Sequence, residues 1–203
     1  NQKEDRMDLI IVESPSKAKT ISKYLKGQYR VDASAGHIRD LPVHTLGVDV
    51  KNNFEPKYVN SEGKEDVIRR LTDATRRADR VYLATDPDRE GEAISWHLCK
   101  VLELDETTTK RLAFNEITPY GINNALEAPR LLDLNIVSSQ ETRRIMDRII
   151  GFRLSYLMQQ KVKSPSAGRV QSAVLKIIVD REKEIENFEP VEYYTVSATL
   201  SQN

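Results

Sequence analysis

Short apolar runs alternate with amphipathic stretches along the first 130 residues of the chain. Four runs have the apolar, β-branched or aromatic composition of strands, and they span residues 9–12, 29–34, 80–84 and 111–114. Four stretches have the residue spacing of helices that bury one face, and they span residues 15–25, 65–77, 91–102 and 118–126. This alternation predicts an α/β fold in which a mostly parallel sheet is covered on both faces by helices, with a loop-rich insertion at 36–60.

The pattern changes after Pro129, where helical spacing replaces the alternation. Two further helices are predicted, at 135–161 and 166–185, and residues 192–200 alternate like a strand. The second of these helices has a predicted inner face formed by Val170, Val174, Ile177, Ile178 and Ile185. We therefore expect a polar tail at 1–6, an α/β domain at 7–130 and the incomplete beginning of a helical domain at 131–203.

The composition of the chain limits the cellular compartments and the kinds of partner that are expected. The single cysteine, Cys99, excludes an internal disulfide and is typical of a reducing compartment, so we expect a cytoplasmic protein. No apolar run approaches the ~20 residues that cross a bilayer, and no membrane partner is expected. The chain holds 31 basic and 31 acidic residues, yet residues 141–182 hold nine basic residues against four acidic ones. This local positive charge predicts a surface for nucleic acid, because partners respond to the local field.

Four carboxylates fall where the predicted strand 80–84 leads into the following helix, and they belong to Asp86, Asp88, Glu90 and Glu92. In open α/β sheets such turns lie outside the carboxyl ends of the strands, where ligands bind. Crowded like charges favour a bound cation, and Mg²⁺ takes one or two carboxylates while it keeps several waters. The alternative is that Asp86 or Asp88 caps the next helix.

A second strand-to-helix turn carries another carboxylate. Glu13 follows the run 9–12, and Ser14 is the predicted N-cap of the next helix. Lys17 falls in the first turn of that helix, beside backbone amides that favour phosphate. If the two strands are neighbours, Glu13, Asp86 and Asp88 converge on one cation. Taken singly, Lys17 also fits a solvated surface lysine, and Glu13 fits a carboxylate beside a helix N-terminus.

Five motifs, in this order, resemble the Toprim part of type IA DNA topoisomerases and its continuation. They lie at residues 13–21, 36–42, 86–92, 114–118 and 166–172. The Glu-Ser-Pro start of the first motif is similar to the bacterial topoisomerase I branch rather than to topoisomerase III. The resemblance implies that residues 7–130 form a Toprim domain and that the chain is the N-terminal part of a longer protein.

In that family a tyrosine attacks a phosphodiester of single-stranded DNA, and another strand passes through the gap before religation. The resemblance therefore implies ATP-independent relaxation of negatively supercoiled DNA. It implies that Glu13 acts as general acid and base at the 3′ oxygen, that Lys17 offsets phosphate charge, and that Arg89 buttresses the catalytic Asp88. The implied Mg²⁺ ligands are Glu13, Asp86, Asp88 and Glu90.

The same resemblance implies a groove that holds DNA. The implied DNA-binding residues are His37, Arg39, Arg143, Arg144, Asp147, Arg148, Arg169 and Gln171. Asp147 can accept a hydrogen bond from a cytosine amino group, and Phe152 stands where the family carries a tyrosine. On pattern alone, His37 fits a structural role equally well, and the arginines fit a salt-bridged solvent face. The implied partner is a single-stranded segment of negatively supercoiled DNA, bound by a monomer associated with the nucleoid.

None of the eight tyrosines lies in the Tyr-x-Arg-Thr setting of the family's nucleophile. We therefore expect the chain to supply the Mg²⁺-binding half of an active site and to be inactive alone. Two alternatives remain. A Toprim nuclease or primase would share the carboxylates but not the motif at 166–172, and an isolated module would bind DNA or Mg²⁺ without catalysis.

Overall fold

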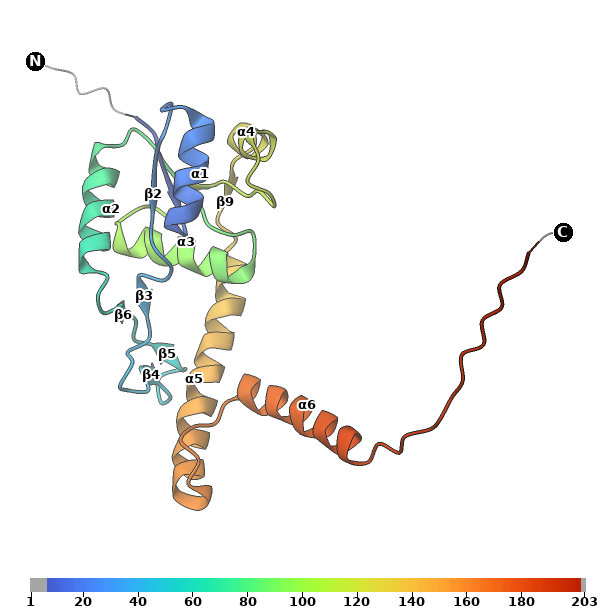
Figure 1. Ribbon diagram of the computed structural model, residues 1–203. Helices are drawn as coiled ribbons and strands as arrows, with labels where there is room; N and C mark the ends of the chain where they lie inside the picture. The colour runs from blue at the N-terminus through green and yellow to red at the C-terminus, as the bar shows by residue number, and fades with distance from the viewer. Residues whose placement is uncertain (1–6, 202–203) are drawn as a thin grey trace, which may run out of the picture. The chain divides into compact units, whose positions relative to one another are not determined.

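The computed structural model describes residues 7–201, so the predicted polar tail at 1–6 lies outside the described residues. The chain divides into two compact units between Ile149 and Ile150, and each unit is described by itself (Figure 1). No helix within 7–201 is long and apolar enough to cross a membrane.

The first unit is built on a five-stranded sheet with the order β2-β1-β7-β8-β9. Its strands are β1 (Leu9–Val12), β2 (Arg30–Ala33), β7 (Val81–Ala84), β8 (Lys110–Arg111) and β9 (Arg130–Leu131). All neighbours pair in parallel except β9, which runs antiparallel to β8. The predicted mostly parallel sheet is confirmed. The predicted strand at 111–114 corresponds to β8, which has only two residues and begins one residue earlier. Strand β9 is not predicted from the sequence, because a two-residue strand gives no periodic pattern.

Four helices cover the two faces of this sheet. They are α1 (Pro15–Leu25), α2 (Glu65–Arg77), α3 (Arg89–Val101) and α4 (Pro119–Glu127). Side chains of β1 alternate between the faces: Leu9 and Ile11 join the core under α2 and α3, whereas Ile10 and Val12 join the core under α1 and α4. Because every residue of β1 is buried, the strand reads as an unbroken apolar run.

Capping residues fix where two of these helices begin. The Ser14 hydroxyl accepts a hydrogen bond from the Lys17 amide (3.3 Å) at the start of α1, and Gly27, at φ 81°, follows its end. The Thr118 hydroxyl accepts from the Gly121 amide (3.0 Å) at the start of α4. The sequence predicts both N-caps, and both are confirmed.

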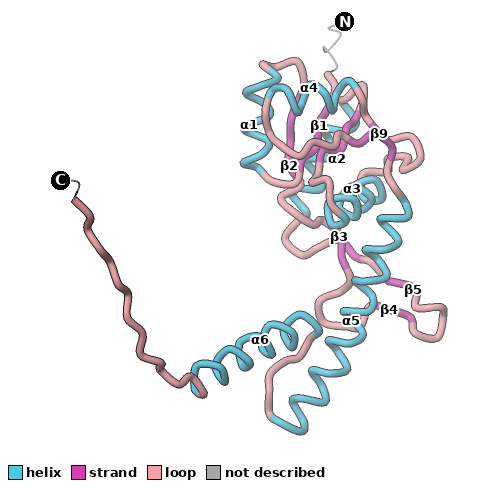
Figure 2. Tube along the Cα trace, turned by 90° about the vertical axis from the view of Figure 1, so that its right-hand side faces the viewer, coloured by secondary structure: helices cyan, strands magenta, loops and turns pink. Residues whose placement is uncertain are grey.

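The insertion between β2 and α2 contains short strands where the sequence predicts only loops. They are β3 (Arg39–Asp40), β4 (Val48–Asp49), β5 (Glu55–Pro56) and β6 (Val59–Asn60). Strand β3 pairs with β6, and β4 pairs with β5, both antiparallel. The β4–β5 hairpin lies beside the long helix α5 (Leu134–Val162) (Figure 2).

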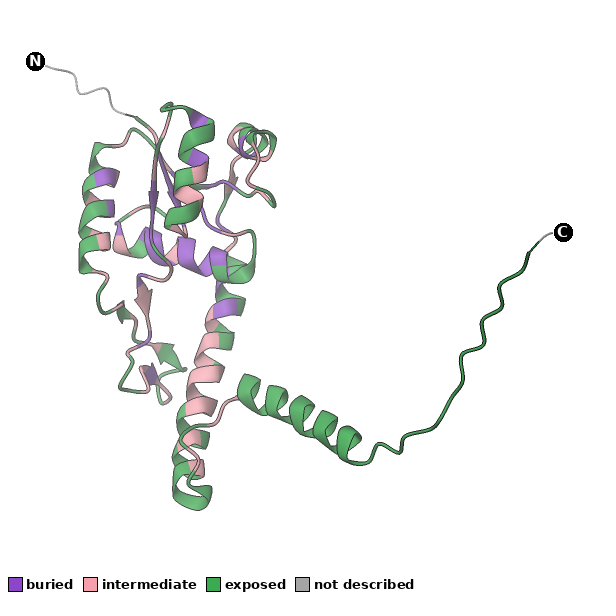
Figure 3. Cartoon of the chain, viewed as in Figure 1, coloured by how far each residue is buried: buried purple, intermediate pink, exposed green. Residues whose placement is uncertain are grey.

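Helix α5 begins in the first unit and ends in the second, which continues with α6 (Arg169–Glu186). The predicted helices are confirmed here, but the predicted inner face of α6 is wrong for this structure. Its residues Val170 and Ile177 are 57% and 69% exposed, and no described residue of α6 is buried (Figure 3). The predicted strand at 192–200 is irregular chain, since a strand needs a partner for its hydrogen bonds.

Candidate active site

The acidic turn and Glu13 lie at the same edge of the sheet. Strands β1 and β7 are parallel neighbours, and their last residues, Val12 and Ala84, are paired in register. Glu13 follows Val12 directly, and Asp86 comes two residues after Ala84. Both carboxylates therefore lie beyond the carboxyl ends of adjacent strands, where open α/β sheets bind ligands.

Lys17 reaches this edge from the first turn of α1. Its ammonium forms an ion pair with the Asp86 carboxylate, and the two side chains are 28% and 43% exposed. Asp86 thus already faces a positive charge at a position that solvent can reach. A hard carboxylate oxygen turned toward a cation fits the donor set that Mg²⁺ prefers.

Asp88 caps helix α3. Its Oδ1 accepts a hydrogen bond from the Gly91 amide at 2.7 Å, so the capping role considered from the sequence is present in the structure. A Cβ on Gly91 would lie 2.0 Å from the Asp86 carbonyl oxygen, so only glycine fits this close approach. The turn from Asp86 to Gly91 is therefore folded tightly back on itself.

Arg89 and Glu90 are the two exposed residues of the first turn of α3. Glu90 Oε2 accepts a hydrogen bond from Gln140 Nε2 at 3.1 Å, and His37 Nε2 lies 3.9 Å from the same oxygen. Within residues 7–201, no three His, Cys, Asp or Glu side chains are grouped so that they could hold a metal ion. Asp86 and Glu90 each contact a protein partner here, and the assignment of the four carboxylates to Mg²⁺ stays a prediction.

Glu92 does not face the acidic edge with its neighbours but lies in the interior, 1% exposed. Arg111 Nη1 of strand β8 lies 3.1 Å from Glu92 Oε2, and Arg130 donates to both carboxylate oxygens at 2.9 and 2.5 Å. The Asp133 amide donates to Glu92 Oε1 at 2.7 Å. Burial opposes ionisation of Glu92, but these donors hold its pKa below the ordinary value.

Arg111 connects this buried carboxylate to the acidic turn. Its Nη2 donates to the carbonyl oxygens of Thr85 (3.0 Å) and Asp86 (2.8 Å), and its side chain is fully buried. Burial lowers the pKa of Arg111 to about 10, and the nearby Glu92 charge opposes that shift. Sequence reasoning misses Glu92 and Arg111 as a pair. The available signal is an arginine at the start of the apolar run 111–114, because a buried guanidinium requires an acceptor.

A polar cleft of about 250 Å³ lies between α3, α5 and the segment that contains β3. Its lining residues are His37, Asp40, Glu90, His97, Gln140, Arg143, Arg144 and Asp147. Four of the predicted DNA-binding residues therefore meet Glu90, a predicted Mg²⁺ ligand, in one place. Three lining residues, Asp40, His97 and Gln140, are not among the predicted ones. Burial lowers the pKa of His97 to about 3, so this imidazole is neutral at pH 7.

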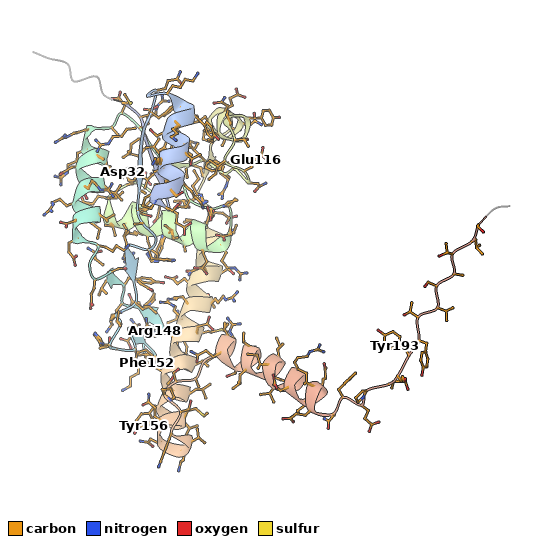
Figure 4. The ribbon with its side chains drawn as sticks, in the orientation of Figure 1. Asp32, Glu116, Arg148, Phe152, Tyr156 and Tyr193 are labelled. Atoms are coloured by element: carbon orange, nitrogen blue, oxygen red, sulfur yellow. The ribbon has the colours of Figure 1, made fainter. Side chains whose placement is uncertain are left out.

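Three arginines predicted to bind DNA contact protein groups in the first unit. Arg144 donates to both Asp40 carboxylate oxygens at 3.0 and 2.5 Å. Arg148 donates to the Pro42 carbonyl oxygen at 2.8 Å (Figure 4). The Arg39 guanidinium lies 4.9 Å from the Tyr58 ring centroid and 5.6 Å from that of Trp96. A phosphate that binds Arg144 or Arg148 must therefore either replace a protein acceptor or use the remaining N–H groups of the guanidinium.

The remaining predicted residues belong to the second unit. Arg169 and Gln171 lie in the first turn of α6, and Gly168 precedes them as the N-cap residue. The Ser155 hydroxyl donates to the Ala167 carbonyl oxygen (3.1 Å) and accepts from its amide (3.0 Å). These two hydrogen bonds fasten the motif at 166–172 to α5 within this unit.

Comparisons with known proteins agree with this architecture. The Toprim domain family matches residues 8–117, and a family described as DNA topoisomerase matches residues 132–203. The chain therefore belongs to the Toprim family, and the two matches together are those of a bacterial type IA DNA topoisomerase. A solved structure of full-length topoisomerase I from Thermotoga maritima is 47% identical, with a TM-score of 0.80. The match covers 89% of this chain and 31% of that protein.

The buried ion network predicts a stability change that can be measured. Replacing the Glu92 carboxylate by an amide (Glu92→Gln) leaves Arg111 buried without its counter-charge. We expect the free energy of unfolding to fall by about 3–5 kcal/mol, the usual effect of breaking a buried ion pair. Urea unfolding followed by the fluorescence of Trp96, the single tryptophan, measures the change. The matched control, Glu127→Gln, removes an exposed carboxylate of α4 and should have little effect.

The pH dependence provides a second measurement of the same interaction. Because the folded-state pKa of Glu92 lies below the ordinary value, its contribution to stability is present above the unfolded pKa of about 4.3. That contribution is lost as the pH falls from there toward the folded pKa. The wild type should therefore lose stability more steeply in this acidic range than Glu92→Gln. If the stability of the two proteins falls with pH in the same way, Glu92 does not form the proposed stabilising ion pair.

Proposed function

We propose that this chain supplies the acid/base and Mg²⁺-binding half of a type IA topoisomerase active site. The observation that carries the proposal is the position of Glu13 and Asp86 beyond the ends of adjacent parallel strands, with Lys17 paired to Asp86. The reaction is ATP-independent relaxation of negatively supercoiled DNA, by transient cleavage of one strand, strand passage and religation. The activity belongs to the whole protein, since this chain corresponds to 31% of the Thermotoga maritima enzyme.

Each residue at the sheet edge has a proposed role. Glu13 gives a proton to the 3′ oxygen that leaves during cleavage and takes it back during religation. Lys17 offsets the charge that develops on the phosphate once it is released from Asp86. Arg89 buttresses the carboxylates around the catalytic Asp88. Glu13, Asp86, Asp88 and Glu90 would hold Mg²⁺, which supplies Lewis-acid stabilisation of the scissile phosphate when bound.

The polar cleft beside α5 is the proposed start of the DNA groove. Arg143 and Arg144, which line the cleft, and Arg148, one turn further along α5, would contact the backbone of single-stranded DNA. Asp147 would accept a hydrogen bond from a cytosine amino group. His37 lines the same cleft, and Arg39 is a further proposed DNA contact of the first unit. In the second unit, Arg169 and Gln171 are proposed DNA contacts. The position of His37 close to Glu90 supports a route from the groove to the carboxylates.

The nucleophile is proposed to lie outside these 203 residues. None of the eight tyrosines is followed at the right spacing by arginine and threonine. A Toprim nuclease or primase is the less favoured alternative, because the DNA topoisomerase family also matches residues 132–203. We expect the protein to act as a cytoplasmic, nucleoid-associated monomer on a single-stranded segment of DNA.

The Mg²⁺ site can be tested with variants that preserve the helix cap. Asp86→Asn and Asp88→Asn remove one charge each, and asparagine at position 88 can still cap α3. We expect calorimetric titration with Mg²⁺ to give weak binding in the wild type and none in the double variant. Asp79→Asn, an exposed carboxylate on the loop before β7, serves as the control. Equal binding by the double variant and the wild type would rule out the assigned ligands.

The groove predicts salt-dependent binding of single-stranded DNA in spite of zero net charge. Arg143→Ala and Arg169→Ala should each lower the slope of log affinity against log salt by about 0.7 for every phosphate that the arginine binds. Arg77→Ala on α2 removes the same charge outside the cleft and should leave the slope unchanged. Asp147→Ala should instead reduce the preference between two oligonucleotides that differ at one cytosine. If the arginine variants keep the wild-type slope, the DNA path lies elsewhere.

The missing nucleophile predicts that the chain alone forms no covalent bond with DNA. Incubation with a 5′-labelled and a 3′-labelled oligonucleotide and Mg²⁺, followed by denaturing electrophoresis, should show no labelled protein. An adduct mapped by mass spectrometry to one of the tyrosines would show that this chain holds a complete active site. The DNA-binding result above is the positive control, since it shows that the oligonucleotide is bound during the assay.

A further inference from the structure

A second and larger cleft lies on the neighbouring face of α5. Its volume is about 690 Å³, and its walls are the turn of the β4–β5 hairpin and the α5 segment from Glu141 to Ile149. The hairpin and the helix lie side by side in both views of the chain (Figures 1 and 2). Both walls belong to the first unit. None of its lining residues is assigned to the acidic edge or to the DNA cleft.

The floor of this cleft is apolar. Phe54 and Pro56 come from the hairpin, and Ile145, Met146 and Ile149 come from α5. Phe54 and Met146 are 47% and 49% exposed, so an aromatic ring and a thioether are presented to a ligand. A volume within about 300–1,000 Å³, an apolar floor and a few polar groups at the rim are the usual features of small-molecule sites.

The backbone of the hairpin turn is strained in a way that exposes Phe54. Asn53 and Phe54 both have left-handed φ angles, 48° and 60°, which a bulky aromatic residue rarely adopts. Three local contacts hold this conformation: Asp49 Oδ1 accepts from the amides of Lys51 (3.2 Å) and Asn52 (3.3 Å), and Asn52 Nδ2 donates to Glu55 Oε2 (2.6 Å). Backbone strain of this kind persists only where the surrounding contacts hold the residue in place. It is often found at ligand-binding positions.

The charge around the cleft selects the ligand. Its rim carries two carboxylates, Glu55 and Glu141, and among the described residues that line it there is no lysine, arginine or histidine. The nearby Lys57 is 3.7 Å from Asp49 Oδ2, on the hairpin side. The two rim carboxylates favour a cation over a phosphate, in contrast to the arginine-lined cleft on the next face of α5. Of the two, Glu141 also faces the Tyr58 hydroxyl and the Arg39 charge, whereas Glu55 lies on the hairpin.

We propose that this cleft binds a small organic amine, with its apolar body on Phe54 and Met146 and its ammonium between Glu55 and Glu141. An apolar or aromatic body gains contact with the phenyl ring and the methionine sulfur. The protonated nitrogen forms charge-assisted hydrogen bonds with the carboxylates. The inference does not depend on the proposed topoisomerase function, because no residue of the cleft takes part in it.

The three methionines of the chain, Met7, Met146 and Met158, provide a direct readout. Methyl-labelled methionine gives three NMR signals, and Met146→Leu identifies the one in the cleft. Titration with 2-phenylethylamine should shift the Met146 signal in a saturable way and leave the other two unchanged. The neutral 2-phenylethanol and the anionic 3-phenylpropanoate should bind at least about fivefold more weakly. An unmoved Met146 signal, or equal responses to the three compounds, would overturn the proposal.

Two sets of variants separate binding from structure. Glu55→Gln with Glu141→Gln should weaken amine binding by about tenfold, whereas Glu62→Gln with Glu127→Gln removes the same charge elsewhere and should not. Phe54→Gly relieves the left-handed strain, so the melting temperature should not fall, while amine binding should be abolished. Retained binding in Phe54→Gly, or equal weakening by the two glutamate pairs, would show that the cleft is not the site.

Discussion

One buried guanidinium, that of Arg111, supports the acidic edge of the sheet. It donates to the Thr85 and Asp86 carbonyl oxygens, and it pairs with Glu92 in the first turn of α3. Glu92 in turn accepts from the Asp133 amide, just before α5 begins. Two buried charges therefore link strand β8, the acidic turn, α3 and the start of α5, the helix that lines the polar cleft. Because isolated buried charges are so costly, these elements are constrained to meet in one arrangement.

The sequence predicts the backbone of the first unit well where local signals agree. The bounds of β1, α1 and α2 match the prediction, because an apolar run, a capping serine or an amphipathic stretch marks each of them. The sequence does not predict that β1 and β7 are neighbours, because the order of strands in a sheet depends on packing between distant segments. The predicted convergence of the carboxylates therefore depends on that condition. The pairing of Val12 with Ala84 fulfils that condition and brings Glu13 and Asp86 to one edge.

The side-chain partners are harder to predict than the backbone. Glu92 and Glu90 look alike in the sequence, yet they point to opposite environments, because two positions along a helix differ by more than half a turn. Arg39 looks like a DNA contact, but its guanidinium lies over two aromatic rings that come from separate segments. Helix α6 differs from these examples. Its sequence has the spacing of a helix with one apolar face, but the described chain does not bury that face.

The position of Trp96 makes the intrinsic fluorescence of the protein sensitive to a local structural change. The chain has one tryptophan, and its indole touches Arg39 from β3, Tyr58 from the insertion and Lys100 from its own helix. A nearby guanidinium and phenol change the emission of an indole when they move. All intrinsic tryptophan fluorescence of the chain therefore reports on the packing of the insertion against α3, beside the cleft that holds Arg144 and Asp40. Movements of that wall can be followed in stopped-flow experiments with the unlabelled protein.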